Sequence, residues 1–189
     1  MRAVTKSEAA TSAEGRALLL PYAGCVPRIH ADAWIAPGVV VIGDVEIGAD
    51  SSLWFGCVVR GDVHAIRIGA RTNLQDHCVV HVTAGRFATA IGDEVTVGHR
   101  AVVHGCTVRD GAMIGIGAIV LDGADVGEEA WIAAGSVVSP GMKVPPRALV
   151  RGLPGRAVRT LEQDEIDQQR ARTLEYVATA RSYAAGSGT

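Results

Sequence analysis

A six-residue repeat occupies most of the chain and limits the folds that it can adopt. Beginning near Ile29, an aliphatic residue recurs at every sixth position, in runs that restart at Ile68, Ile91 and Val108. If this residue is position i, a glycine, aspartate or asparagine usually lies between it and a small residue at i+4. Each hexad therefore predicts one short strand and one tight turn, and three hexads close a triangular coil. The small residues at i+4 are Val39, Val45, Ser51, Cys57, Thr72, Cys78, Ala84, Ala101, Thr107, Ala112, Ala118, Ala124, Ala130 and Ser136.

The composition agrees with a mainly β solenoid of stacked coils. Aromatic residues make up only 4% of the chain, and glycine supplies 23 of its 189 residues, which suits tight turns and a narrow interior. This length favours a single domain. A net charge of -2 gives no indication of a nucleic-acid partner, and no apolar run approaches the roughly 18 residues of a membrane span. The four cysteines form no CxxC pair, so we expect reduced thiols and a cytoplasmic protein.

The repeat divides the chain into four parts. We expect an N-terminal arm over residues 1–28 and a solenoid domain over residues 29–158. A C-terminal helix is expected over residues 159–185, followed by a frayed tail over residues 186–189.

The predicted helix has its own sequence signals. From Thr160 the chain is rich in Glu, Gln, Arg and Ala and contains no Gly or Pro before Gly186, which favours a helix. Thr160 and Gln163 have the spacing of a capping box. We expect this helix to pack along the solenoid. The face predicted to pack carries Ile166, Ala171, Leu174, Val177 and Ala178.

The hexad register brings two distant histidines together. If the hexads that begin at 68, 74 and 80 form one coil, those that begin at 91, 97 and 103 form the next. His81 and His104 then both occupy position i+1 on the third face of the prism, although 23 residues separate them in the sequence. They should lie on adjacent strands, about 4.8 Å apart. Two imidazoles so placed can reach one metal ion at about 2.0–2.1 Å each.

A third histidine indicates how the chain assembles. His99 occupies position i+2 on the second face, so within one chain it points away from the other two. It can join them if the second face of one chain packs against the third face of a neighbour. Three chains arranged head to tail around a threefold axis close such contacts into a ring. The spacing therefore predicts a homotrimer with a metal ion at each interface, and three histidines with an open fourth position typify catalytic zinc.

Other polar residues occupy the same positions as these histidines on neighbouring coils, so they should stack with them in columns. Arg60 lies one coil before His81, and Asp76 lies one coil before His99, so the same packing predicts an Arg60–Asp76 ion pair between chains, beside the metal. Gln75, at i+1 on the second face, is placed to reach a water at the metal. The residues expected to be structural are His30, His64, His77 and the stacked interior pair Cys57 and Cys78, although His64 could lie at the mouth of the site.

Several of these residues lie in motifs of a known family. The segments RGD at 60–62, NLQD at 73–76 and VGHRAVVHG at 97–105, together with His81, resemble the γ-class carbonic anhydrases. The resemblance covers residues 29–158 and implies a left-handed parallel β-helix that forms a trimer.

The resemblance also implies a chemistry. His81, His99 and His104 would bind zinc, or ferrous iron or cobalt, at the trimer interfaces. The residues that would hold the subunits together are Arg60, Asp62 and Asp76. Gln75 would orient the attacking hydroxide, and the implied reaction is the reversible hydration of carbon dioxide to bicarbonate.

The chain departs from the most active members of that family at two acidic positions. Residues 82–90 read VTAGRFATA, without a carboxylate, and Val63 stands where another glutamate is expected. Asp62 and His64 are the nearest ionisable residues that could take the proton that hydration releases. The alternative functions are a metal-dependent thioesterase at the same site, an acyltransferase of the wider hexapeptide class, and a non-catalytic binding or structural subunit.

Overall fold

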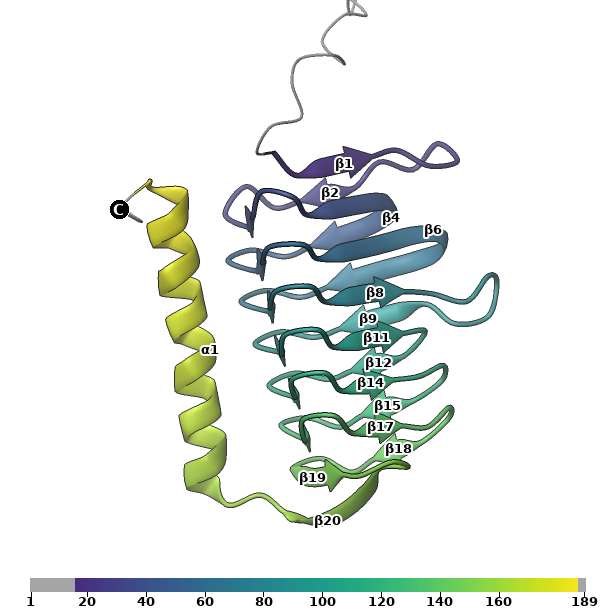
Figure 1. The fold of residues 1–189 in the computed structure, drawn as a ribbon, viewed down its shortest axis with the longest axis vertical. Helices are drawn as coiled ribbons and strands as arrows, with labels where there is room; N and C mark the ends of the chain where they lie inside the picture. The colour runs from purple at the N-terminus through teal and green to yellow at the C-terminus, as the bar shows by residue number, and fades with distance from the viewer. Residues whose placement is uncertain (1–15, 187–189) are drawn as a thin grey trace, which may run out of the picture.

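The computed structural model describes residues 16–186. Its strands stack into a parallel β-helix, and one helix runs along the side of the stack (Figure 1). The strands are β1 (Leu18–Leu20), β2 (Arg28–Ile29), β3 (Trp34–Ile35), β4 (Val40–Ile47), β5 (Ser52–Leu53), β6 (Val58–Ile68), β7 (Asn73–Leu74), β8 (Val79–His81), β9 (Thr89–Ile91), β10 (Thr96–Val97), β11 (Val102–His104), β12 (Thr107–Val108), β13 (Met113–Ile114), β14 (Ile119–Val120), β15 (Asp125–Val126), β16 (Trp131–Ile132), β17 (Val137–Val138), β18 (Lys143–Val144), β19 (Ala148–Arg151) and β20 (Arg156–Thr160). The helix α1 spans Gln163–Ala184.

Three ladders of parallel strands surround the interior. The first face consists of β2, β9, β12, β15 and β18 with the C-terminal ends of β4 and β6. The second face consists of β3, β5, β7, β10, β13, β16 and β19. The third face consists of β1, β8, β11, β14 and β17 with the N-terminal parts of β4 and β6. Because β4 and β6 run around one corner, the first and third faces join into a single 12-stranded sheet.

The strand pairing confirms the predicted register. The aligned positions of two successive coils are Ile68↔Ile91, Leu74↔Val97 and Val80↔Val103. Farther along, Trp131 pairs with Leu149, 18 residues later, which is three hexads. Asn73 pairs with Thr96, 23 residues later, because the loop between β8 and β9 adds five residues to that coil. The repeat therefore sets the coil length, and insertions protrude as loops.

The interior is filled by aliphatic and small side chains. Leu53, Leu74 and Ile114, at position i, are fully buried, as are the small residues Cys78 and Ala101 at i+4. Such close packing leaves little room for larger residues at i+4.

Two residues predicted to face the interior do not lie there. Ala84 is exposed, because it lies in the loop that interrupts the repeat. Thr107 is only partly buried, because the coil is one residue short after His104 and Cys106 enters the interior in its place. Where the hexad count changes, it no longer specifies which side chain points inward.

The corner turns explain His77. His77 lies at i+3, where most hexads have a residue in the left-handed conformation, and its φ is 61°. A Cβ placed on Gly56, the corner residue of the preceding coil, would overlap the imidazole of His77. His77 is therefore an exposed turn residue that packs on a glycine, as its expected structural role requires.

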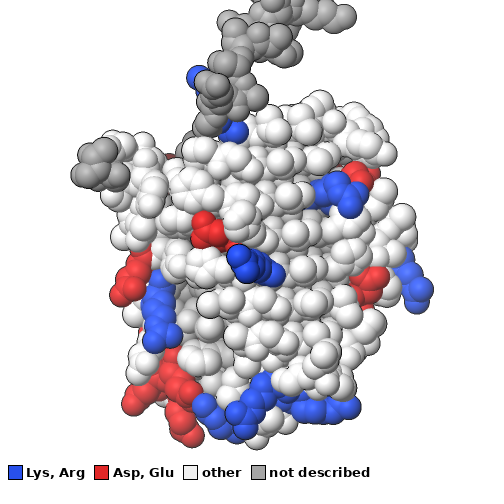
Figure 2. Space-filling model, in the orientation of Figure 1, with Lys and Arg blue, Asp and Glu red and all other residues white. Residues whose placement is uncertain are grey.

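The three faces present different surfaces to their surroundings. The outward side chains of the first face include ion pairs such as Arg67–Glu46 at 3.2 Å and Arg109–Asp125 at 2.8 Å. The third face has an aliphatic outer surface instead. Its outward column is Val58, Val79, Val102, Ile119 and Val137, each partly or well exposed in the single chain. Figure 2 shows few charged side chains over β8, β11, β14 and β17, and a band of Lys and Arg near β20 at the lower end.

The helix α1 begins two residues later than the predicted capping box implies. Thr160 is the last residue of β20, which pairs antiparallel with β19, so it cannot cap a helix. The N-cap is Glu162, and the backbone N–H of Glu162 donates to the carboxylate of Glu165 at 3.0 Å. The capping box is therefore formed by Glu162 and Glu165.

The buried side of α1 also differs from the predicted one. Leu174 is 46% exposed, and Ala171 and Ala178 face solvent. The buried residues are Ile166, Gln169, Thr173 and Ala180. Polar residues face the solenoid because the second face itself presents polar groups there. The hydroxyl of Thr173 lies 2.9 Å from that of Thr96, which accepts a hydrogen bond from Asn73 at 2.9 Å.

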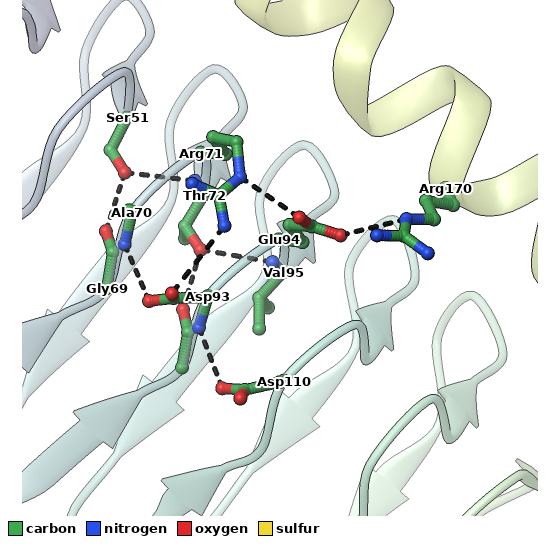
Figure 3. A network of polar contacts seen from close by, with 11 residues as sticks. Ser51, Gly69, Ala70, Arg71, Thr72, Asp93, Glu94, Val95, Asp110 and Arg170 are labelled. Atoms are coloured by element: carbon green, nitrogen blue, oxygen red, sulfur yellow. Dashed lines mark hydrogen bonds and ion pairs between the residues drawn. The ribbon is translucent and has the colours of Figure 1, made fainter.

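An ion pair in the N-terminal half of α1 and aromatic contacts at its C-terminal end hold the helix against the solenoid. At the corner between the first and second faces, Glu94 binds both Arg71, at 3.0 Å, and Arg170 of α1, at 3.1 Å (Figure 3). Near the C-terminal end of α1, the ring of Tyr183 packs against Trp34 and Trp54, with its centroid 5.2 Å from that of Trp34 and 5.4 Å from that of Trp54.

Between residues 16 and 186, no helix is long and apolar enough to cross a membrane.

Candidate metal centre

The register places His81 and His104 side by side on the third face. They are directly paired at the ends of β8 and β11, as predicted. Nδ1 of His81 lies 3.1 Å from Nε2 of His104, and the ring centroids are 5.1 Å apart. Both rings are partly exposed, so this pair of nitrogens is accessible from outside the third face.

Each of these rings is held from behind by a carboxylate. Nε2 of His81 lies 3.0 Å from Oδ1 of Asp62, and Nδ1 of His104 lies 2.6 Å from Oδ1 of Asp122. Burial tends to raise the pKa of Asp62, but hydrogen bonds from His81 and Arg60 outweigh it and leave that pKa below its usual value. The hydroxyl of Thr83, opposed by burial and assisted by His104, lowers the pKa of Asp122. Both groups are therefore ionised acceptors at neutral pH.

The ionised carboxylates determine where the imidazole protons lie. Asp62 and Asp122 accept hydrogen bonds, so in the neutral form of each imidazole the proton lies on Nε2 of His81 and on Nδ1 of His104. The facing nitrogens then both carry lone pairs, 3.1 Å apart. Two lone pairs at that distance repel unless a cation lies between them. Two nitrogens bound to one tetrahedral zinc ion are about 3.3 Å apart, so the donor set fits a metal ion.

His99 also has a carboxylate beside one ring nitrogen, but it lies on a different face. It follows β10 on the second face, and its Nδ1 lies 2.8 Å from Oδ2 of Asp76. This pairing leaves Nε2 with its lone pair, on a side chain that is 41% exposed. Within residues 16–186 of one chain, no group of three or more His, Cys, Asp or Glu residues is placed to hold a metal ion. Within one chain, the pair His81 and His104 on the third face is therefore separate from His99 on the second face.

Gln75 lies directly beside His99. Its Oε1 accepts a hydrogen bond from the backbone N–H of His99 at 3.3 Å, and the side chain is only 7% exposed. The thiol of Cys57 donates to the carbonyl of Gln75 at 3.0 Å, and the thiol of Cys78 donates to the carbonyl of Gly98 at 3.1 Å. The two cysteines expected in the interior therefore brace the turns that carry Gln75 and His99.

The remaining predicted site residues have partners within the chain. Arg60 forms an ion pair with Asp62, so it lies at the back of His81. Asp76 is occupied by His99, and a contact between Arg60 and Asp76 would require a second chain. Nδ1 of His64 accepts a hydrogen bond from the N–H of Ala65 at 2.8 Å.

Sequence reasoning missed three residues near this centre. Asp122 and Thr83 lie behind His104, and a register count that looked one coil ahead and one position along could have found Asp122. Tyr176 of α1 lies in a hollow with Asp76 and Glu175. Burial, followed by the charge of Asp76, raises the pKa of Tyr176.

Comparisons with known proteins identify the family. The family described as bacterial transferase hexapeptide (six repeats) matches residues 27–61. A carbonic anhydrase of Geobacillus kaustophilus is 44% identical over 168 residues, which cover 89% of this chain and 92% of that protein. The chain belongs to the γ-carbonic anhydrase-like family. The mitochondrial γ-carbonic anhydrase 2 of Arabidopsis thaliana is also 44% identical over 84% of this chain, which spans only 59% of that protein's length.

Some proteins that are similar to this chain in sequence or fold are not named as carbonic anhydrases. The carnitine operon protein CaiE of Escherichia coli is 36% identical over 82% of this chain and 79% of its own. The crystal structure of a hexapeptide transferase family protein from Anaplasma phagocytophilum superposes with a TM-score of 0.84. It is 40% identical and covers 88% of this chain. The β-helix is therefore shared among proteins with several names, and the function has to be argued from the site.

Proposed function

We propose that this protein catalyses the metal-dependent, reversible hydration of carbon dioxide to bicarbonate at the interfaces of a homotrimer. One observation carries the proposal: Nδ1 of His81 and Nε2 of His104 face each other at 3.1 Å, while a carboxylate lies within hydrogen-bond distance of the other nitrogen of each ring. The likeness to the Geobacillus carbonic anhydrase supports the reaction.

The surfaces around the histidines favour the trimer. His81 and His104 lie on a face whose outward column is aliphatic, which is the composition of a protein interface. The column that contains His99 carries Phe55 and Ile116 above and below it, and they are 37% and 55% exposed in the single chain. Packing the second face of one chain on the third face of the next would cover both columns and bring His99 to the histidine pair. In that arrangement Arg60 and Asp76 meet across the interface.

The residues that would hold the metal are His81, His104 and the neighbouring chain's copy of His99. Zinc is the ion that three neutral histidines and an open position favour, with ferrous iron or cobalt as further candidates. When bound, the ion supplies the Lewis acidity that lets water lose a proton near neutral pH. In this proposal Gln75, whose Oε1 accepts from the backbone N–H of His99 and whose Nε2 donates to Asn73, would orient the reacting water.

Proton release is the step for which the chain has the fewest suitable acceptor groups. Both oxygens of Asp62 are already engaged, by His81 and by Arg60. The two positions at which related enzymes are expected to carry glutamates are Val63 and the acid-free loop of residues 82–90. In this proposal Asp62 positions His81, and the proton leaves to buffer or by way of His64.

Metal analysis combined with a hydration assay tests the proposal. His81→Ala, His99→Ala and His104→Ala should each lower the metal content sharply and abolish stopped-flow hydration of carbon dioxide. His77→Asn is the matched control, because asparagine tolerates the left-handed turn and His77 is no ligand in this scheme. Full metal occupancy in the His99 variant would exclude the shared site. A metal-replete wild-type protein without hydration at any buffer concentration would exclude the reaction.

A further inference from the structure

The loop between β8 and β9 contacts the coils below it. The loop is closed by a bridge in which the N–H of Thr83 donates to the carbonyl of Phe87 at 3.0 Å and the N–H of Phe87 donates back at 3.1 Å. The hydroxyl of Thr83 donates to Oδ2 of Asp122 at 2.6 Å, across 39 residues of sequence. The base of the loop is thus tied to the carboxylate that lies behind His104.

Phe87 packs the loop against the coils that contain His104 and Asp122. A Cβ added to Gly105 would lie 3.0 Å from Cβ of Phe87, and one added to Gly123 would lie 3.0 Å from its ring. These glycines directly follow His104 and Asp122 in the sequence. The guanidinium of Arg86 lies over the Phe87 ring, 4.9 Å from its centroid. The loop therefore packs against the glycines that follow His104 and Asp122.

These contacts fix Asp122 in one orientation. Oδ1 faces Nδ1 of His104 at 2.6 Å, and Oδ2 receives the hydroxyl of Thr83. With both oxygens engaged, the carboxylate cannot rotate away without losing a hydrogen bond. The proton on Nδ1 of His104 is held in place, and Nε2 stays directed at His81.

We propose that Thr83 and Asp122 are positioning residues for the metal ligand His104, and that the Thr83–Phe87 loop serves to hold this Thr83–Asp122–His104 relay in place. The inference rests on the proposed function, because it takes His104 as a ligand. It gives the acid-free loop a role other than proton transfer. Groups behind a ligand histidine fix its tautomer and ring orientation, and their loss commonly lowers metal affinity about 10–100-fold.

The test uses the full-length protein loaded with zinc or cobalt. Asp122→Asn should raise the metal dissociation constant about 10–100-fold. Thr83→Val, which removes only the hydroxyl, should act in the same direction with a smaller effect, and Thr83→Ser should restore wild-type affinity. Thr107→Val is the matched control, since Thr107 is a partly buried threonine in β12, outside the relay. Affinity is measured by competition with a chelator, and the thermal midpoint of the metal-free protein checks folding.

The absorption spectrum of the cobalt-loaded protein separates positioning from general stability. Altered cobalt bands in Thr83→Val and Asp122→Asn, absent from Thr83→Ser and Thr107→Val, would support the relay. If Thr83→Val and Asp122→Asn keep the affinity and spectrum of a wild-type protein that binds metal, this inference is wrong while the proposed function stands. A wild-type protein that binds no metal would overturn both.

Discussion

Each histidine of the candidate centre has a carboxylate on one ring nitrogen. The pairs are His81 with Asp62, His99 with Asp76 and His104 with Asp122. A carboxylate in this position selects the tautomer that is protonated on its side, so the opposite nitrogen keeps a lone pair. Because a metal ligand must be a neutral imidazole, the residues are prepared to bind at neutral pH, and the ion should be lost as the pH falls.

Proton release should limit turnover, and this leads to a prediction about buffer. Val63 is 43% exposed and Ala84 lies in the exposed loop, so neither position offers an acceptor. Hydration by the wild-type protein should therefore rise steeply with imidazole concentration. Val63→Glu and Ala84→Glu should raise the rate at low buffer and flatten that dependence. The measurement is stopped-flow hydration at several buffer concentrations. Fast wild-type turnover at low buffer would contradict the prediction, and His64→Ala would then locate the internal acceptor.

The residue-scale arrangement could be predicted only where the hexad count is regular. His81 and His104 follow from it because each lies one residue after an interior aliphatic residue on paired strands. Thr83 escaped prediction because it lies in an insertion that has no register. Asp122 has a register position, one coil after His104 and one position along, so spacing could have placed it nearby, but spacing does not fix the rotamers that form the contact.

At the scale of elements, α1 was predictable as a helix, but its buried side was not. Apolar periodicity assumes that the covered surface is apolar. Here the second face presents Asn73 and Thr96, so α1 turns Gln169 and Thr173 toward it and leaves Leu174 outside. The docking of this helix thus depends on a buried polar contact that no apolar pattern reveals.

Removing that contact should destabilise the protein measurably. Thr173 is 1% exposed, and its hydroxyl lies 2.9 Å from that of Thr96. Thr173→Val keeps the shape and deletes the hydrogen bond, so we expect a loss of about 1–3 kcal/mol in the free energy of unfolding. Thr179→Val, at an exposed position of the same helix, should change it by about 0.5 kcal/mol or less. Chemical denaturation followed by circular dichroism measures both. Equal effects would show that helix propensity, and not the buried contact, is responsible.

The start of α1 should stabilise the protein in a pH-dependent manner. The hydrogen bonds from Arg159, followed by the backbone N–H of Glu162, lower the pKa of Glu165 to about 2 from 4.5. A carboxylate with a lowered pKa contributes fully above its unfolded value, and this contribution is lost as the pH falls from 4.5 toward 2. The difference in thermal midpoint between wild type and Glu165→Gln should therefore be largest above pH 4.5 and shrink below it. A difference independent of pH would contradict the assigned pairing.

At the scale of the whole molecule, the three faces of the prism have three separate environments. The first face carries ion pairs, part of the second is covered by α1, and the third presents the aliphatic column with His81 and His104. The number of faces and the coil length follow from the six-residue period. The hand of the coil does not, because coils of either hand have the same period. Within residues 16–186 of one chain nothing covers the third face, and in the proposed trimer a second copy would cover it and supply His99.

This arrangement can be tested by mixing two inactive variants. In a ring, each site takes His81 and His104 from one chain and His99 from the next, so neither His81→Ala nor His99→Ala alone should bind metal well. A heterotrimer of the two variants contains a single interface at which an intact histidine pair meets an intact His99. Heterotrimers isolated through two different affinity tags should therefore bind about one metal ion, compared with about three in the wild-type trimer. In the proposed trimer the three sites would be equivalent by symmetry, so the regained ion should restore about a third of the wild-type hydration rate per trimer. Heterotrimers without metal would place all three ligands within one chain. A mixed sample that remains monomeric would remove the interface itself.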